Sequence, residues 1–145
     1  MEIREAQIQD LDGLLMLYSH LHGEVPPERT AALEAQWRGM AADANHHVLL
    51  GFEGGSLVGS CVLLVVPNLS RGARPYGLVE NVITHPQHRR QGVGSALLAH
   101  VQALAKAAGC YKIMLMTSRR DESTLRFYCK AGYNCQDKTA FLMQL

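Results

Sequence analysis

The feature that most constrains the fold is a strand-like run that leads through a glycine-containing turn into a helix. The run ends at Thr84, Pro86 imposes a turn, and Gly92 and Gly94 begin a helical pattern. Such a turn leaves several backbone N–H groups pointing outward at the helix N-terminus, where the helix dipole adds to their positive potential. The segment therefore predicts an α/β unit with an anion site suited to phosphate.

The residues around this turn narrow the kind of phosphate site. Glycine allows a phosphate to approach the backbone closely, and Arg89 and Arg90 add positive charge at the mouth. No Gly-Lys-Ser/Thr follows, which excludes a Walker loop, and the third glycine of a dinucleotide-binding fingerprint is missing. The alternative is that Gly92 and Gly94 serve only a tight turn.

Hydrophobic periodicity predicts the remaining elements. A Gly54-Gly55 turn between two strand-like runs predicts a hairpin. The sequence favours a mixed sheet with helices on both faces over a purely parallel one. The predicted strands span residues 3–6, 46–53, 57–66, 76–84, 111–117, 133–136 and 139–145, and the predicted helices span residues 8–21, 28–40, 92–108 and 121–131.

Length and composition indicate one globular domain over residues 1–145, with 48% hydrophobic and 19% charged residues. A formal net charge of +1 argues against a sequence-blind nucleic-acid binder. No apolar run is long enough to span a bilayer, and the first residues carry acids where a signal peptide needs bases. The four cysteines show no CxxC spacing, so we expect reduced thiols and a cytoplasmic protein without a membrane partner.

The segment Arg89-Arg90-Gln91-Gly92-Val93-Gly94 resembles the signature Gln/Arg-x-x-Gly-x-Gly/Ala of the GCN5-related N-acetyltransferase (GNAT) family. A second segment, from Asp121 to Tyr133, resembles the C-terminal motif of that family, a short helix that contains Phe-Tyr-x-x-x-Gly-Phe/Tyr. The opening Ile3-Arg4-Glu5-Ala6 resembles the usual start of the family. The resemblance thus extends over nearly the whole chain.

This resemblance implies a twisted, mostly antiparallel mixed sheet of six to seven strands with about four helices on its two faces. It also implies that acetyl-CoA is the co-substrate and that the amides of the glycine turn hold its pyrophosphate. Asp121 stands where the family often has Asn. The residues expected to bind the cofactor are Val82, Ile83, Thr84, Arg89, Arg90, Gln91, Gly92, Val93, Gly94, Ser95, Asp121, Thr124, Phe127 and Tyr128.

Glu80 is the candidate for handling the acceptor amine. It is a carboxylate in an otherwise apolar strand, and alternation predicts that Leu78, Glu80, Val82 and Thr84 share one face. A carboxylate there can accept the amine proton, directly or through water, or can clamp the ammonium. The alternative is a charge on an edge strand that faces water.

Tyr128 is the candidate acid. Its phenol can donate a proton to the departing thiolate, and the resemblance implies a position beside the sulfur of coenzyme A. The alternative is a core aromatic on a short amphipathic helix, which we favour for Phe127. The resemblance also implies a bulged strand near Val82, whose backbone N–H is the expected oxyanion donor.

Two further stretches resemble the glucosamine-6-phosphate N-acetyltransferases within this family. They are Gly109-Cys110-Tyr111-Lys112-Ile113 and Val79-Glu80-Asn81-Val82, in which Asn81 replaces an acid. The acceptor is therefore expected to be a primary amine of a small molecule. The chain is also expected to form a homodimer. We expect the acceptor cleft between the first two helices, the loop at residues 67–75 and the last strands. Basic residues there that could recognise an anionic acceptor are Arg71, Arg74, Arg119, Arg120 and Lys138.

The histidines do not favour a metal site, since the adjacent His46 and His47 would point opposite ways in a strand. Two other functions stay open at this stage. One is a non-catalytic module that binds acetyl-CoA for regulation, and the other is an acetyltransferase for peptide or protein amines.

Overall fold

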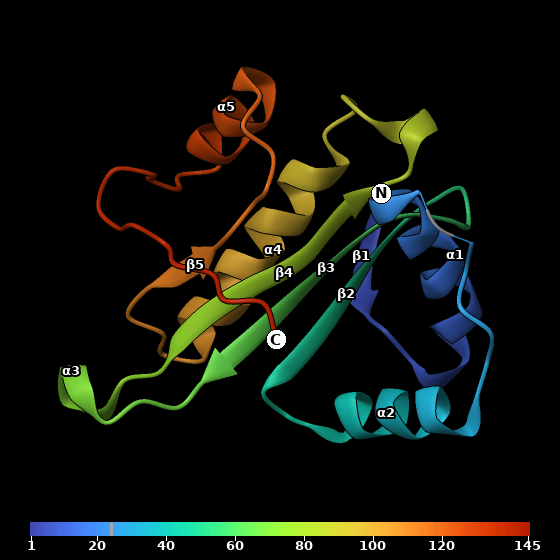
Figure 1. Ribbon diagram of the computed structural model, residues 1–145, viewed down its shortest axis with the longest axis horizontal. Coiled ribbons are helices and arrows are strands. Elements are labelled where there is room, and N and C mark those ends of the chain that lie inside the picture. The colour runs from blue at the N-terminus through green and yellow to red at the C-terminus, as the bar shows by residue number, and fades with distance from the viewer. Residues whose placement is uncertain (24) are drawn as a thin grey trace.

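The computed structural model describes residues 1–23 and 25–145. Its sheet has the order β1-β2-β3-β4-β5 (Figure 1), and the three pairs among β1 to β4 are antiparallel. β5 is parallel to β4. The strands are β1 Glu2–Glu5, β2 His46–Glu53, β3 Ser56–Val66, β4 Tyr76–Thr84 and β5 Ile113–Leu115. The helices are η1 Ile8–Asp10, α1 Leu11–His22, α2 Ala31–Ala42, α3 Ser70–Ala73, η2 Pro86–His88, α4 Val93–Ala107 and α5 Glu122–Lys130.

Alternating side chains divide the core into two layers, one on each face of the sheet. Leu49, Cys61 and Leu63 pack with Leu97 and Val101 of α4 on one face. On the opposite face, the neighbouring strand residues pack against α1 and α2; this layer comprises Leu11, Leu14, Trp37, Val48, Leu50 and Val62. The prediction of a mixed sheet with helices on both faces is confirmed.

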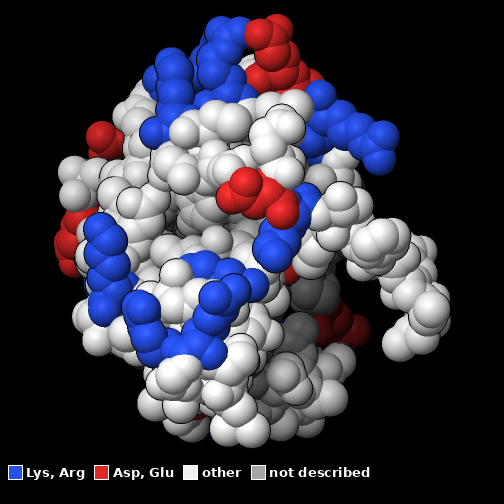
Figure 2. Space-filling model, turned by 90° about the vertical axis from the view of Figure 1, so that its left-hand side faces the viewer, with Lys and Arg blue, Asp and Glu red and all other residues white. Residues whose placement is uncertain are grey.

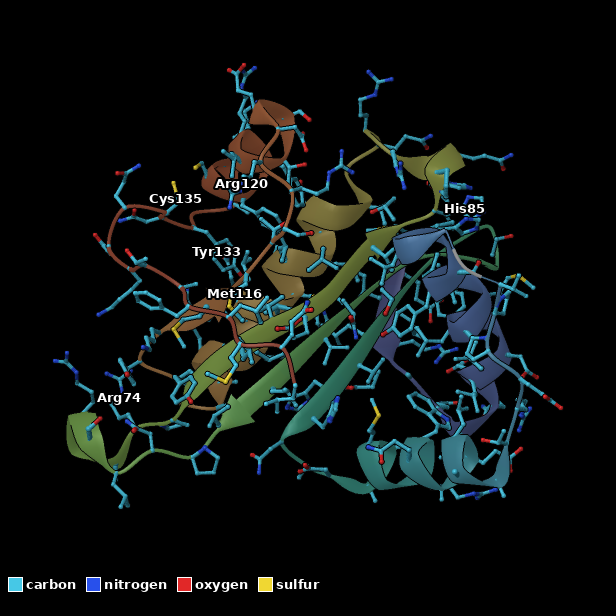
Figure 3. The ribbon with its side chains drawn as sticks, viewed as in Figure 1. Arg74, His85, Met116, Arg120, Tyr133 and Cys135 are labelled. Carbon is cyan, nitrogen blue, oxygen red and sulfur yellow. The ribbon has the colours of Figure 1, made fainter. Side chains whose placement is uncertain are left out.

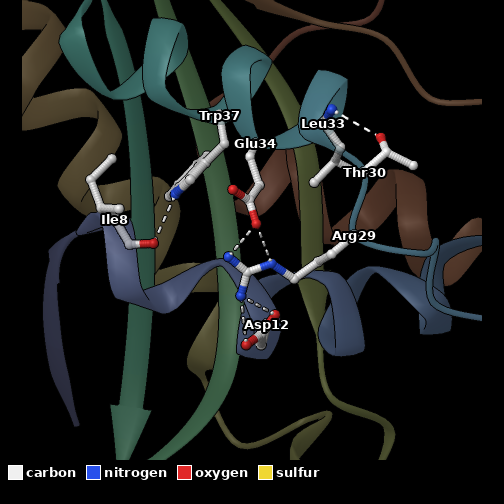
Figure 4. Close-up of polar contacts among 7 residues, drawn as sticks. All are labelled: Ile8, Asp12, Arg29, Thr30, Leu33, Glu34 and Trp37. Atoms are coloured by element: carbon white, nitrogen blue, oxygen red, sulfur yellow. Dashed lines mark hydrogen bonds and ion pairs between the residues drawn. The ribbon is translucent and has the colours of Figure 1, made fainter.

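α2 is attached to the α1 layer by polar contacts (Figure 4). The Trp37 indole donates to the Ile8 carbonyl at 3.0 Å, and Arg29 lies between Asp12 at 3.1 Å and Glu34 at 2.8 Å. The helix was expected from residue 28 but begins at residue 31, because the Thr30 side chain accepts from the Leu33 N–H and caps it.

The expected six to seven strands are wrong, since the described part of the chain forms five. Residues 133–136 and 139–145 have apolar residues at strand spacing but form no strand. Phe141, Leu142, Met143 and Leu145 are largely exposed. A strand requires a hydrogen-bonded neighbour, and none of the strands in the described residues pairs with these segments.

Two further predictions differ from the structure only in the extent of an element. The strand expected over residues 111–117 is limited to Ile113–Leu115, because pairing with β4 ends there. The loop at residues 67–75 contains the short α3, in which Arg71, Gly72 and Ala73 have left-handed backbone angles. The Gly54-Gly55 hairpin and the bounds of β4 agree with the sequence prediction.

Candidate active site

A cleft of about 1120 Å³ opens where β4 outruns β5. The parallel register ends at Val79 opposite Leu115, whereas β4 continues to Thr84. Residues 79–84 form one wall of the cleft, and residues 115–119 line the other. Within the described chain, no strand pairs with the open edge of β4 beyond Val79. Its backbone N–H and C=O groups are therefore available to an extended ligand.

The cleft wall contains a β-bulge. Ser60 pairs with Ile83 and Val62 pairs with Glu80, so one residue of β3 lies opposite both Asn81 and Val82. Asn81 has φ +50°, a left-handed conformation that is uncommon for a residue other than glycine. A bulge in β4 near Val82 was expected, and the register places one there.

The bulge changes which side chains share a face. Val82 packs against the core layer of α4. Glu80 lies opposite Val62, which belongs to the layer of α1 and α2. The prediction that Glu80, Val82 and Thr84 share one face is therefore wrong, because the extra residue reverses the alternation. Glu80 is half-buried, lines the cleft and lies on the α1 side of the sheet.

The N-terminus of α4 forms the floor of the cleft. Gly92 is the N-cap, with φ +88° and no side-chain cap, so the first N–H groups of the helix have no intrahelical acceptor. A Cβ on Gly94 would lie 3.0 Å from the Phe127 ring. Glycine at residue 94 thus allows α5 to approach the start of α4, and Phe127 both packs on the core and lines the cleft.

The arginines before the helix are held differently. Arg89 Nε donates to the Thr84 carbonyl at 3.4 Å, while Arg90 adopts φ +61°. Both line the cleft. Gln91 does not, because its side chain donates to the Gln87 carbonyl at 2.9 Å. The anionic ligand expected here would meet both guanidinium groups as well as the amides of α4.

α5 supplies the aromatic side chains of the cleft. The Asp121 carboxylate is its N-cap, accepting from the Thr124 N–H at 3.0 Å and from the side chains of Ser123 and Arg119. The Ser123 hydroxyl, the Thr124 amide and Arg119 hold the pKa of Asp121 well below its usual range. Asp121 lies outside the cleft lining, and its proposed contact with the cofactor stays a prediction.

Tyr128 lies in the cleft and is half-buried. Burial raises the pKa of its phenol, Cys61 also raises it, and Arg119 acts in the opposite direction. Its ring stacks edge-on against Tyr133 at 6.2 Å and lies 4.9 Å from the Phe127 ring. A phenol that remains protonated at neutral pH can donate a proton to a leaving group.

The structure brings most of the predicted site together. Except for Gln91 and Asp121, all of the expected cofactor and catalytic residues line this one cleft. His20 and Leu21, at the end of α1, form a third wall. The first helix was expected beside the acceptor cleft, but these two residues were not, because nothing in the sequence indicates where that helix ends relative to β4. Residues 116–118, which the sequence did not single out, also line the cleft.

The expected basic residues separate into two groups. Arg119 lines the cleft. Arg74 is at the opposite end of β4 from His85 (Figure 3) and donates to the carbonyls of Gly109 and Cys110. Arg71 lies over the Tyr111 ring at 5.9 Å. Within one chain, the loop at residues 67–75 does not reach the cleft.

Three imidazoles meet beside the cleft. His20 and His85 stack edge-on at 4.9 Å, and His85 lies 5.8 Å from His88. Burial lowers the pKa of His85, as do His20, His88 and Arg89.

The described residues contain no group of three or more His, Cys, Asp or Glu side chains that could hold a metal ion. In the same residues, no helix is long and apolar enough to cross a membrane.

Comparison with known proteins identifies the family. The sequence profile of the acetyltransferase (GNAT) family matches residues 11–133. The chain belongs to the GNAT family. Its resemblance to the glucosamine-6-phosphate branch is also supported. A glucosamine 6-phosphate N-acetyltransferase of Trypanosoma brucei brucei is 33% identical over 140 residues, which cover 95% of this chain and 92% of that protein.

Two further proteins are similar to this GNAT protein, one in structure and one in sequence. A protein of Agrobacterium tumefaciens with a solved structure, provisionally assigned as an acetyltransferase, superposes with a TM-score of 0.93 and 37% identity over the full length of both chains. An aminoalkylphosphonate N-acetyltransferase of Salmonella typhimurium is 30% identical, covering 91% of this chain and 84% of that protein. GNAT acetyltransferases use acetyl-CoA as co-substrate, and acetyl transfer is the activity of the family.

Proposed function

We propose that this protein transfers the acetyl group of acetyl-CoA to the primary amine of a small molecule, by direct attack in a ternary complex. One observation carries the proposal. The edge of β4 that β5 leaves unpaired beyond Val79, the N-terminus of α4 and Tyr128 all open into a single cleft. A thioester chain lying along β4 would have its phosphates at α4 and its sulfur toward Tyr128.

In this reaction the amine nitrogen bonds to the carbonyl carbon and the carbon–sulfur bond breaks. Glu80 would accept or relay the proton lost by the ammonium, because it borders the cleft on the α1 side. The backbone N–H at Val82, in the bulge, would donate to the developing oxyanion. Tyr128 would supply a proton to the thiolate and recover one from solvent.

The acceptor we propose is an amine that also carries a phosphate or phosphonate, with glucosamine 6-phosphate tested first. Two relatives of this chain are named for such amines. The cleft offers the Arg119 guanidinium to such a group, and imidazole groups of His20 and His88 that can hydrogen-bond to it. We therefore expect faster thiol release from acetyl-CoA with glucosamine 6-phosphate than with glucosamine.

A panel of amines decides between the alternatives. Release with polyamines, amino acids or peptides but not with the phosphorylated sugar would move the acceptor to those classes. Tight acetyl-CoA binding without release on any amine would contradict catalysis and leave a regulatory binding module.

We also propose that the protein is a cytoplasmic homodimer. The support for a dimer is the C-terminal segment, in which four large apolar side chains are at least 81% exposed. Figure 2 faces the side that carries β5 and α5, where charged side chains lie among uncharged surface. Light scattering should give twice the chain mass, and deletion of residues 139–145 should give the monomer mass. A monomeric full-length chain would overturn this part.

A further inference from the structure

Three histidines form a continuous cluster between α1 and the turn that follows β4. His20 belongs to α1, whereas His85 (labelled in Figure 3) and His88 belong to the turn that leads to α4. The His20 and His85 rings meet edge-on with 4.9 Å between their centroids, and the His85 and His88 centroids are 5.8 Å apart. His20 and His88 line the cleft, whereas His85 does not. His85 is therefore the inner ring, in contact with both imidazoles that a ligand in the cleft would meet.

The inner ring is held in its neutral form. His85 Nδ1 accepts a hydrogen bond from the Gln87 N–H at 3.4 Å, so this nitrogen carries no proton. Burial lowers the pKa of the His85 imidazole, and the neighbouring His20, His88 and Arg89 lower it further. A neutral ring thus separates the two outer imidazoles, and a charge on one of them meets no charge on His85.

The outer rings have surroundings that accept a proton more readily. His88 Nδ1 lies 3.4 Å from a carboxylate oxygen of Glu53, and a carboxylate at this distance favours an imidazolium. His20 contacts the neutral ring of His85 edge-on. Either outer imidazole can therefore become a charged hydrogen-bond donor to a ligand in the cleft.

The other charges of the cleft favour an anionic ligand. Besides the imidazoles, the charged side chains that line it are Glu80, Arg89, Arg90 and Arg119. Three of these four are cations, so a ligand with two negative charges is attracted more strongly than one with a single charge. A phosphate dianion beside His20 and His88 would in turn stabilise their protonated forms, because opposite charges a few ångströms apart favour each other.

We propose that His20 and His88 bind the phosphate of the acceptor as a dianion and take up a proton from solvent when it binds, while His85 remains neutral between them. This inference rests on the proposed acetyltransferase function and names the side chains that select the acceptor. The acceptor is the source of this phosphate because His20 belongs to α1 and Glu80 lies on the α1 side of the sheet, whereas the cofactor phosphates are expected at the start of α4. The proton returns to solvent when the product leaves.

Calorimetry on the protein saturated with coenzyme A, which has no acetyl group to transfer, measures binding without turnover. Glucosamine 6-phosphate is titrated at pH 7 in two buffers of different ionisation enthalpy, so that the difference in heat counts the protons taken up. His20→Gln keeps a hydrogen-bonding side chain but cannot carry the proton, and should reduce the proton uptake and lower the affinity by about 10-fold. His100→Gln on α4 is the matched control, because His100 does not line the cleft. Equal proton uptake by the wild type and a folded His20→Gln protein would overturn the inference.

The charge of the ligand provides a second test. A phosphate ester is mostly a dianion at pH 7, since its second pKa is about 6, whereas a sulfate ester carries one negative charge. The wild type should therefore bind glucosamine 6-phosphate more tightly than glucosamine 6-sulfate, and this preference should shrink by about 10-fold in His20→Gln. The preference should also shrink from pH 7 to pH 9, because imidazoles with an ordinary pKa of about 6.5 lose the proton there even when a bound anion raises that pKa. A preference that is unchanged in His20→Gln would contradict the role assigned to this ring.

Two further outcomes identify the source of the phosphate and separate the inference from the function. Proton uptake on binding of acetyl-CoA alone, if lost in His20→Gln, would overturn the assignment to the acceptor, because the cofactor phosphates would then occupy this place. Proton-linked binding of the sugar phosphate without thiol release would refute the proposed function and retain the phosphate site. His88→Gln repeats each measurement from the other ring, and thermal melting identifies any variant that has failed to fold.

Discussion

The two halves of β4 follow one apolar sequence pattern but meet different neighbours. Residues 76–79 lie between β3 and β5, with Gly77, Leu78 and Val79 in register on both sides. Residues 80–84 pair with β3 alone, contain the bulge and line the cleft. The backbone groups of residues 76–79 are therefore paired on both edges of the strand, whereas residues 80–84 have one unpaired edge that a ligand can bind. The candidate site therefore lies where β5 no longer pairs with β4.

The largest effect is expected from a substitution that blocks the cleft beside residues 80–84. Gly94→Val would place side-chain atoms against Phe127, since even a Cβ lies 3.0 Å from that ring. The displaced α5 and the blocked amides should weaken acetyl-CoA binding by roughly 100-fold or more, the cost of one or two charge-assisted hydrogen bonds.

Calorimetry with acetyl-CoA measures this effect. Gly39→Ala is the matched control, because a Cβ at Gly39 of α2 meets nothing within 4 Å. Gly92→Val tests the same loop through its backbone, since φ +88° is strained for valine. Unchanged affinity in a folded Gly94→Val protein would mean that phosphate is held elsewhere.

The next largest effect should come from the leaving-group side of the cleft. Tyr128→Phe keeps the ring stacked on Tyr133 but removes the donor. We expect kcat to fall by about 10- to 10³-fold with little change in acetyl-CoA affinity. Because burial raises the pKa of Tyr128, its phenol should remain a donor to pH above about 10.

Rates measured from pH 6 to 10 check this expectation. Tyr111→Phe serves as the control, since Tyr111 packs against Arg71 and Lys112 far from the cleft. A wild-type kcat in Tyr128→Phe would leave positioning and backbone donors as the whole of catalysis.

Glu80→Gln probes the acceptor side with a smaller and pH-dependent effect. Glutamine keeps the size of Glu80 but cannot accept a proton, so kcat/KM for the amine should fall most at low pH, where the ammonium dominates. The defect should shrink as pH rises and the free amine becomes available. A defect independent of pH would assign Glu80 to clamping the acceptor.

The smallest effect on activity should come from the opposite sheet edge. The Asp10 carboxylate accepts two hydrogen bonds from Arg4, at 2.7 and 2.9 Å, and one from the Gln7 N–H. These contacts, that with Arg4 first, lower the pKa of Asp10. Asp10→Asn should reduce stability by about 1 kcal/mol at pH 7 and leave acetyl-CoA affinity unchanged.

The sign of the pH dependence follows from the lowered pKa. The stabilisation is complete above the unfolded pKa of about 3.9 and disappears as pH falls through the lower folded value. Denaturation of the wild type and Asp10→Asn should therefore differ at pH 7 and converge near pH 2. A difference that persists there would show that Asn is a poorer partner for Arg4 and Gln7 for reasons other than charge.

Several local features of the site could be predicted from the sequence because short-range chemistry sets them. The helix that starts at Gly92, the helix capped by Asp121 and the hairpin at Gly54-Gly55 depend on residues adjacent in the chain. The convergence of the glycine turn with Tyr128 followed from a family resemblance. The contact of His20 with His85 could not be predicted, since it joins α1 to the turn after β4.

The sequence by itself determined where β4 begins and ends, where α4 begins, and that both lie in a GNAT fold. Only the tertiary structure decided which side of the sheet Glu80 and Val82 occupy, because a bulge depends on the partner strand and reverses the alternation after it. It also decided that β5 ends at Leu115 and that residues 139–145 form no strand. Strand propensity is local, whereas the hydrogen bonds that make a strand come from a neighbour that the sequence does not name.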